Sequence, residues 1–301
     1  MSPAEQPQSA PDELLSVAAV ARRIGVAPAT LRTWARRYGI GPNEHEAGSH
    51  RKYCPSDLAK LTVMRRLISA GVAPADAAEQ AKAHKGEVVI EELTSLCREC
   101  DETINAIFNA SEALDSLFVE TMLRNEITEN GIISAWQEVF VPVLIQVGAA
   151  WEKSGKGIEV EHMLTEILTR VLRESVSENV VPVNARPVLL ASVGEELHSL
   201  ALHALAAALA ERGIETHFLG ARTPVEAISS MVSRFAPPAV FLWAQLPVNG
   251  DPKFVTEIPS VRPVPRVIIG GPGWNPDKCQ NAHFVGSLTL AVDEIAMAVG
   301  A

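Results

Sequence analysis

The residues with the clearest chemistry lie in a short loop near the middle of the chain. Glu196-Leu197-His198 follows a buried strand predicted over Val188–Val193 and opens the next predicted helix. An imidazole can bind iron, copper, zinc or cobalt through one ring nitrogen while a carboxylate orients the other nitrogen. Glu196 and His198 therefore form a candidate metal ligand with its supporting carboxylate.

Two further groups have side chains or spacing suited to a large ligand. Trp151 is followed, after nine residues, by Glu161-His162. Taken singly, each is most simply a core tryptophan or a surface residue, but their joint spacing favours a shared role. Gly270-Gly271 ends a later predicted strand, where missing side chains would let the backbone approach a ligand. A phosphate-binding glycine loop would instead follow the first strand, which disfavours a nucleotide.

A third group of residues suits contacts with nucleic acid. Arginine can donate two hydrogen bonds to guanine and can also contact phosphate, so such side chains both read sequence and hold the DNA backbone. The alternative is an ordinary solvated helix face. The group comprises Thr30, Arg32, Thr33, Arg36 and Arg37 on a predicted helix, and Arg51, Lys52 and Tyr53 on a turn that follows it.

The charge distribution supports a separate DNA-binding head. The chain carries a net charge of −10, but residues 15–82 hold eleven Lys and Arg against five Asp and Glu, a net +6. The rest of the chain therefore carries −16. A basic head on an acidic body is typical of a DNA-binding module joined to a module that does not touch DNA.

The elements that would position these residues fall into three regions. Residues 14–83 show short helices, with Gly25 breaking the first and Pro28 opening the second, and residues 1–13 form a polar tail that we expect to be disordered. Residues 84–183 keep a helical spacing typical of a four-helix bundle. Residues 184–301 alternate strands and helices, as in a parallel doubly wound sheet. The predicted strands are Val188–Val193, Thr216–Leu219, Ala239–Trp243 and Arg266–Ile269, with helices over Ser199–Arg212 and Pro224–Phe235.

The head resembles the MerR family. The resemblance rests on residues 15–21, the helix from Arg32 to Tyr38 and the Arg51-Lys52-Tyr53 turn. It implies a winged helix-turn-helix with the wing arginine and tyrosine on phosphate, and dimeric binding to repeated half-sites in double-stranded DNA. RNA polymerase or another regulatory protein would be a further partner.

The rest of the chain resembles the cobalamin-binding module of methionine synthase and of the CarH/LitR photoreceptor-repressors. Trp151, Glu161 and His162 match a helical cap motif, and Glu196 and His198 match the motif that supplies the lower cobalt ligand. Gly270 and Gly271 match the element that lines the pocket for the nucleotide tail. The resemblance implies adenosylcobalamin between bundle and sheet, with Trp151 over its upper face. In that family the dark state favours a repressing tetramer, and light dissociates it.

The chain departs from that pattern at two positions. Ala201 stands where the motif has a glycine, and Trp243 stands where the family has a serine in the deep slot for the benzimidazole tail. An indole is several times larger than a serine side chain, so it can occupy the slot itself. Three outcomes stay open: the site rearranges and still binds cobalamin, it binds another flat tetrapyrrole such as heme or a bilin, or it binds nothing and Trp243 is a core residue.

These observations predict a multidomain α and α/β protein: a winged helix-turn-helix, a four-helix bundle and a Rossmann-like parallel sheet. We expect a cytoplasmic, non-enzymatic transcriptional regulator that binds DNA as a homodimer or homotetramer and uses cobalamin cobalt, ligated by His198, as its signal. No membrane contact is expected, because the apolar runs fall short of about 20 residues. The alternative is a cobalamin-free module that binds another tetrapyrrole or a protein partner.

Overall fold

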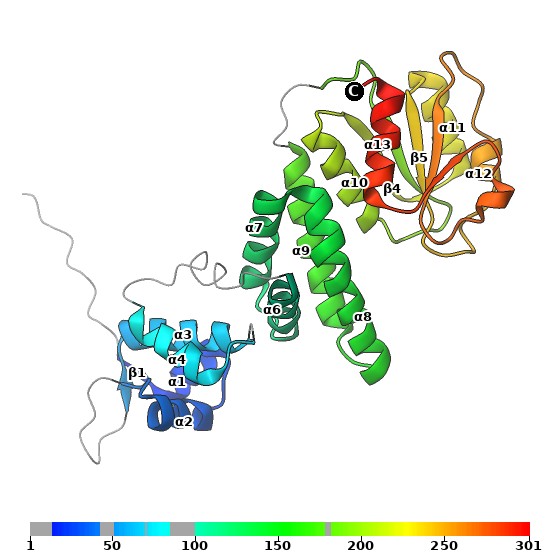
Figure 1. The fold of residues 1–301 in the computed structure, drawn as a ribbon. Helices are drawn as coiled ribbons and strands as arrows, with labels where there is room; N and C mark the ends of the chain where they lie inside the picture. The colour runs from blue at the N-terminus through cyan, green and yellow to red at the C-terminus, as the bar shows by residue number, and fades with distance from the viewer. Residues whose placement is uncertain (1–13, 43–50, 70, 85–99, 178–181) are drawn as a thin grey trace, which may run out of the picture. The chain divides into compact units, whose positions relative to one another are not determined.

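The computed structural model describes residues 14–42, 51–69, 71–84, 100–177 and 182–301. The predicted tail at 1–13 lies outside these residues, as do residues 43–50. The chain divides into two compact units, Met1–Thr121 and Met122–Ala301, which are described separately (Figure 1). The division falls inside the helical region predicted over 84–183.

The N-terminal unit begins with a winged helix-turn-helix. Helix α1 is capped by Ser16, whose side chain accepts a hydrogen bond from the Ala19 backbone N–H. Gly25 ends α1 in the left-handed conformation, at a φ of 79°, which lets the chain turn into α2. The head contains α1 (Val17–Ile24), α2 (Pro28–Tyr38), α3 (Pro55–Ser69) and α4 (Pro74–Ala83), with strand β1 (Leu15–Ser16) antiparallel to β2 (Lys52–Tyr53).

Four helical stretches follow, in agreement with the predicted helical spacing. They are α6 (Cys100–Glu112), α7 (Ser116–Ser134) continuing through the π-helical turn η1 (Ala135–Phe140) into α8 (Val141–Ser154), and α9 (Ile158–Ser177). Within the C-terminal unit, α8 packs on α9 and α9 packs on α10. The four-helix arrangement predicted over 84–183 extends across both units and stays a prediction.

One stretch of helix is more apolar than the sequence patterns indicated. Ser116–Ser154 contains an 18-residue window with a mean hydropathy of 1.5, so by length and composition it would suffice to cross a membrane. Gly131 interrupts its helical backbone at a φ of 74°, and Ile132, Val139 and Val143 are buried inside the protein. Buried apolar residues at helical spacing are typical of a core helix.

The C-terminal domain is a five-stranded parallel sheet in the order β4-β3-β5-β6-β7. All six residues of β3 are buried, as expected for a parallel strand covered on both faces. The predicted doubly wound sheet is confirmed, and the short strand β7 is an addition. The strands are β3 (Val188–Val193), β4 (Thr216–Thr223), β5 (Ala239–Trp243), β6 (Arg266–Gly270) and β7 (His283–Val285).

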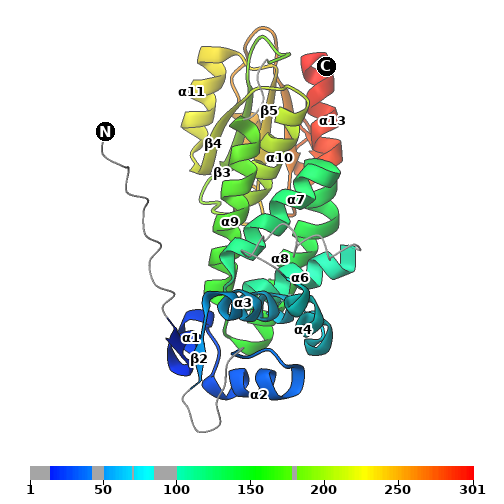
Figure 2. The same cartoon turned by 90° about the vertical axis from the view of Figure 1, so that its left-hand side faces the viewer.

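Helices cover both faces of this sheet, and Figure 2 shows α11 and α13 on opposite sides of it. Side chains of α10 and α13 form one core with the sheet, and those of α11 and α12 form the other. The helices are α10 (Leu200–Glu211), α11 (Val225–Phe235), α12 (Lys253–Thr256) and α13 (Leu288–Val299). Since the chain moves from β3 outward to β4 and then back to β5, the strand order reverses between β3 and β5. Ligands of such sheets bind beyond the carboxyl ends of the strands at this point.

Candidate ligand site and DNA-binding surface

Two loops meet at the point where the strand order reverses. The loop at 194–199 follows β3 and carries Glu196 and His198, and the loop at 244–252 follows the neighbouring strand β5. The Glu196 side chain lies between them and is fully buried. The parallel pairing of β3 with β5 therefore brings segments about fifty residues apart to one site.

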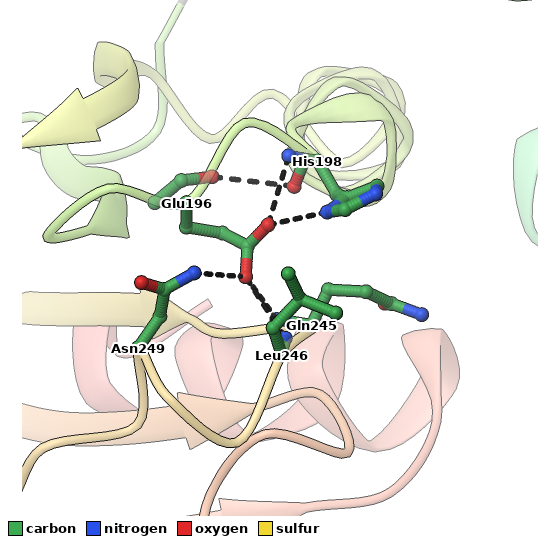
Figure 3. A network of polar contacts seen from close by, with 6 residues as sticks. Glu196, His198, Gln245, Leu246 and Asn249 are labelled. Carbon is green, nitrogen blue, oxygen red and sulfur yellow. Dashed lines mark hydrogen bonds and ion pairs between the residues drawn. The ribbon is translucent and has the colours of Figure 1, made fainter.

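Glu196 joins the two loops through both carboxylate oxygens (Figure 3). Oε1 accepts hydrogen bonds from the His198 backbone N–H at 3.0 Å and from His198 Nδ1 at 2.5 Å. Oε2 accepts from the backbone N–H groups of Gln245 and Leu246, each at 2.9 Å, and from Asn249 Nδ2 at 3.0 Å. The carboxylate thus fixes the loop after β5 as well as the histidine.

These hydrogen bonds decide the charge of Glu196. Burial on its own raises the pKa of the carboxyl group, but donors from Leu246, Asn249 and His198 outweigh it and hold the pKa at about 2. Each donor stabilises the ionised form, so the side chain is a carboxylate at neutral pH. A buried carboxylate of this kind requires all of its partners in place.

His198 presents one ring nitrogen to solvent. Its side chain is 58% exposed, while Nδ1 is held by Glu196. In the neutral ring the carboxylate favours the proton on Nδ1, which leaves the Nε2 lone pair as the position for a metal. Among the residues that the structure describes, no group of three or more His, Cys, Asp or Glu could hold a metal ion. A metal at His198 would therefore have to bring its other ligands with it.

Apolar side chains stand exposed on the same two loops. Leu197 is 66% exposed beside His198, and Leu246 and Val248 on the second loop are 44% and 83% exposed. Exposed apolar groups concentrated at one place mark a binding surface. The surroundings of His198 suit a ligand with a broad apolar face.

The glycines after β6 lie close to protein backbone. A Cβ at Gly271 would lie 2.3 Å from the Ala244 carbonyl oxygen, and one at Gly273 would lie 2.5 Å from the Leu246 carbonyl oxygen. These glycines let the loop after β5 pack closely on the loop after β6. Contact of Gly270 and Gly271 with a ligand stays a prediction.

The three cap residues are exposed at the junction of α8 and α9. Trp151, in the last turn of α8, is 41% exposed, and Glu161 and His162 lie exposed in the first turns of α9. No described hydrogen bond or ion pair joins them to the Glu196 and His198 cluster. Their contact with a ligand stays a prediction.

His203, one turn into α10, is a packing residue. Its ring stacks on Phe218 of β4 with 4.4 Å between the ring centroids. Burial, together with the positive charge of Arg173, lowers the pKa of His203 to about 4. The ring is therefore neutral at physiological pH.

The predicted DNA-contacting residues lie mostly on the surface of the head. Arg32, Arg36 and Arg37 of α2 and Lys52 of β2 are exposed, while Thr30, Thr33 and Arg51 are partly exposed. The Thr33 hydroxyl donates to the Ala29 carbonyl oxygen at 3.0 Å, so it is engaged within its own helix.

Tyr53 departs from the prediction. Its side chain is fully buried, which leaves no surface for phosphate, and its hydroxyl has no hydrogen-bond partner among the residues that the structure describes. Burial raises the pKa of Tyr53, while the positive charges of Arg51 and Arg32 lower it. The tyrosine is thus a core residue that lies within reach of the charges of two arginines. The sequence signal for this burial is the alternation of side chains along β2, which leaves Lys52 exposed and Tyr53 buried.

Sequence reasoning missed several members of the site. Asn249 and the backbone N–H groups of Gln245 and Leu246 bind Glu196 across the sheet. No local pattern distinguishes them. Only the parallel pairing of β3 with β5 places the second loop against Glu196.

Fold and site together define a DNA-binding protein with a ligand-binding sheet domain. Residues 15–83 match the MerR HTH family regulatory proteins, and residues 186–295 match the B12 binding domain. The predicted combination of a MerR head with a cobalamin-binding domain is confirmed.

The relatives agree with this organisation. The chain is 28% identical over 224 residues to the HTH-type transcriptional repressor CarH of Myxococcus xanthus, covering 72% of this chain and 74% of that protein. It is 26% identical over 265 residues to the HTH-type transcriptional repressor CarA of the same organism, covering 86% of this chain and 87% of that protein. The chain is thus a homologue of two transcriptional repressors.

A solved structure shares the fold of the C-terminal part. The monomethylamine corrinoid protein of Methanosarcina barkeri aligns with a TM-score of 0.50 and 13% identity, covering 66% of this chain and 99% of that protein. At this identity the likeness concerns the fold alone.

Proposed function

We propose that this chain is a transcriptional regulator that binds double-stranded DNA through its MerR head and senses a cobalamin through its C-terminal domain. The two matched domains and the two repressor homologues support this function. We further propose that it acts in the cytoplasm without catalytic activity, and that RNA polymerase or a regulatory protein is a partner.

The observation that carries the proposal is the state of His198. One imidazole, oriented by a buried carboxylate, stands exposed among apolar side chains, with no described group of further metal ligands. A single protein ligand suits a metal already held by a macrocycle. The residues around His198 therefore fit a corrinoid whose metal His198 would bind.

The chain's own residues would divide the work of holding this ligand. A bound cobalamin supplies a cobalt centre with exchangeable axial ligands. His198 would bind it through Nε2, and Glu196 would keep the proton on Nδ1 and the ring in place. Leu197, Leu246 and Val248 would shield the lower face from water, while Trp151, with Glu161 and His162, would cover the upper face.

Sensing would operate through assembly. A ligand that binds one oligomeric state more tightly shifts the population toward that state, and the oligomeric state sets DNA affinity. We propose a homodimer or homotetramer on repeated half-sites, with adenosylcobalamin as the ligand and its light-sensitive bond as a trigger.

The test is a titration of the full chain with adenosylcobalamin in the dark, followed by absorption, light scattering and DNA binding. Binding to the wild type should change the absorption spectrum of adenosylcobalamin. His198→Ala should lose this spectral change and any effect of the ligand on the oligomeric state. His283→Ala is the matched control: His283 is 56% exposed and lies 3.6 Å from Glu294, at the start of edge strand β7. A wild type without a spectral change, or a His198→Ala variant with an unaltered one, would contradict the proposal.

A further inference from the structure

A large aromatic residue stands at the centre of the carboxyl edge of the sheet. Trp243, the last residue of β5, pairs with Ser192 of β3 and with Gly270 of β6. It therefore lies at the switch point, in the strand next to the one that leads to His198. This is the position at which the resemblance places the serine of the tail slot.

The Trp243 indole lies on the face of the sheet covered by α10 and α13. It packs against the core formed there, together with Phe241 two residues earlier on the same strand face. Its Nε1 is buried, and within the described part of the chain it has no hydrogen-bond partner. Because a buried donor without a partner is unfavourable, the N–H does not stabilise this position of the ring. Packing against the core holds the ring there.

The space beside the two glycines of β6 is taken by these aromatic rings. A Cβ at Gly270 would lie 2.6 Å from Phe241 Cζ, and a Cβ at Gly271 would lie 3.2 Å from Trp243 Cδ2. The backbone after β6 also lies against the backbone after β5, because the Gly273 N–H donates to the Ala244 carbonyl oxygen at 2.9 Å. The two rings therefore lie where the resemblance places the pocket for the nucleotide tail.

The Trp243 ring at this position has the shape of the group it would exclude. Indole and benzimidazole share one bicyclic frame, a six-membered ring fused to a five-membered ring, and differ by one ring atom. A close-packed interior that accepts one of them has no room for both.

Resting on the proposed function, we propose that the Trp243 indole takes the place of the nucleotide base from within the chain. The site then takes a corrinoid through His198 with the tail left outside the sheet. A corrinoid of the cobinamide class has no nucleotide tail, so it loses no binding contact by this arrangement. Cobalamin must leave its base in water or bound to its own cobalt, where the base competes with His198. The chain therefore prefers tail-less corrinoids.

The experiment titrates the full-length protein with aquocobinamide and with hydroxocobalamin, following the visible spectrum. Wild type should bind aquocobinamide about tenfold or more tightly than hydroxocobalamin, with a spectrum of imidazole ligation that His198→Ala loses. Trp243→Ser should open the slot and bring the ratio of the two affinities close to one or below it. Trp243→Phe keeps one six-membered ring but removes the fused five-membered ring with its N–H, so its ratio of affinities should lie between those of wild type and Trp243→Ser.

The outcomes separate this proposal from the proposed function. Equal or tighter binding of hydroxocobalamin by wild type, with no change of the ratio in Trp243→Ser, overturns the role of Trp243 and leaves corrinoid sensing in place. Binding of neither compound by wild type overturns both. Circular dichroism of each variant confirms the fold, and a misfolded Trp243→Ser leaves the wild-type ratio as the deciding measurement.

Discussion

At the scale of single residues, Glu196 decides the geometry of the site. It is a fully buried carboxylate with five donors, two from His198 and three from the loop after β5. The histidine and that loop therefore keep their places only while Glu196 stays ionised. Its neighbour Glu195 is 75% exposed and pairs only with the exposed Arg222 among its described contacts.

We expect Glu196→Gln to lower the free energy of unfolding by about 2–4 kcal/mol, because its amide group would face hydrogen-bond donors. The depressed pKa also makes stability depend on pH. The contribution of ionised Glu196 to the free energy of unfolding is complete above pH 4.5. It is lost as the pH falls toward about 2, a change of about 3 kcal/mol. Urea unfolding from pH 6 to pH 2 measures both effects.

Glu195→Gln is the control and should retain the wild-type dependence on pH. His203 affects stability over a higher pH range than Glu196. Its pKa is about 4 in the folded protein and about 6.5 in the unfolded chain, so the free energy of unfolding falls as the pH drops from 6.5 toward 4. A Glu196→Gln variant with wild-type stability at every pH would show that the carboxylate does not hold the loops.

At the scale of elements, the two loops after β5 and β6 depend on backbone contact. Gly271 has a φ of 101°, and an added Cβ would meet the Ala244 carbonyl oxygen at 2.3 Å. A side chain here must both strain the backbone and push apart the loop that Glu196 binds.

Gly271→Ala should therefore destabilise the C-terminal domain by about 2–4 kcal/mol, seen as a lower Tm. Gly286→Ala is the matched control, since the nearest atom to its Cβ, Phe284 Cε1, lies 4.0 Å away. We expect that variant to stay within about 0.5 kcal/mol of wild type. Similar Tm values for the two variants would mean that the loops can separate without cost.

A second contact at this scale ties the head to the start of the helical region. Asp115, buried before α7, accepts from Arg65 at 2.8 Å and lies 3.4 Å from Arg66, both on α3. Two cations on one buried carboxylate fix α3 relative to the turn between α6 and α7. The N-terminal unit thus contains more than the DNA-binding motif.

At the scale of the whole molecule, function depends on a basic head joined to an acidic sensor. The recognition helix α2 exposes Arg32, Arg36 and Arg37, while Leu31 and Trp34 face inward. Arginines so placed contribute both base and phosphate contacts.

Arg36→Ala should weaken specific DNA binding by about 1–3 kcal/mol, which is about 5- to 150-fold in Kd. Fluorescence anisotropy on a duplex selected from a random library by the wild-type protein gives this number. Arg234→Ala removes the same charge from an exposed position on α11 and should leave the Kd unchanged. Equal affinities for wild type and Arg36→Ala would place the DNA-binding surface elsewhere.

Local sequence patterns were enough to predict the main elements and the chemistry carried by neighbouring residues. Periodicity and breakers located α1, α2, β3 and β5, because helix and strand periods are local properties. The same locality paired Glu196 with His198, two residues apart. The three-dimensional fold was needed to show that Tyr53 is buried, that Asn249 completes the Glu196 site and that Phe241 and Trp243 pack beside Gly270 and Gly271. These contacts depend on which strands become neighbours, and parallel pairing joins segments about fifty residues apart that carry no shared local signal.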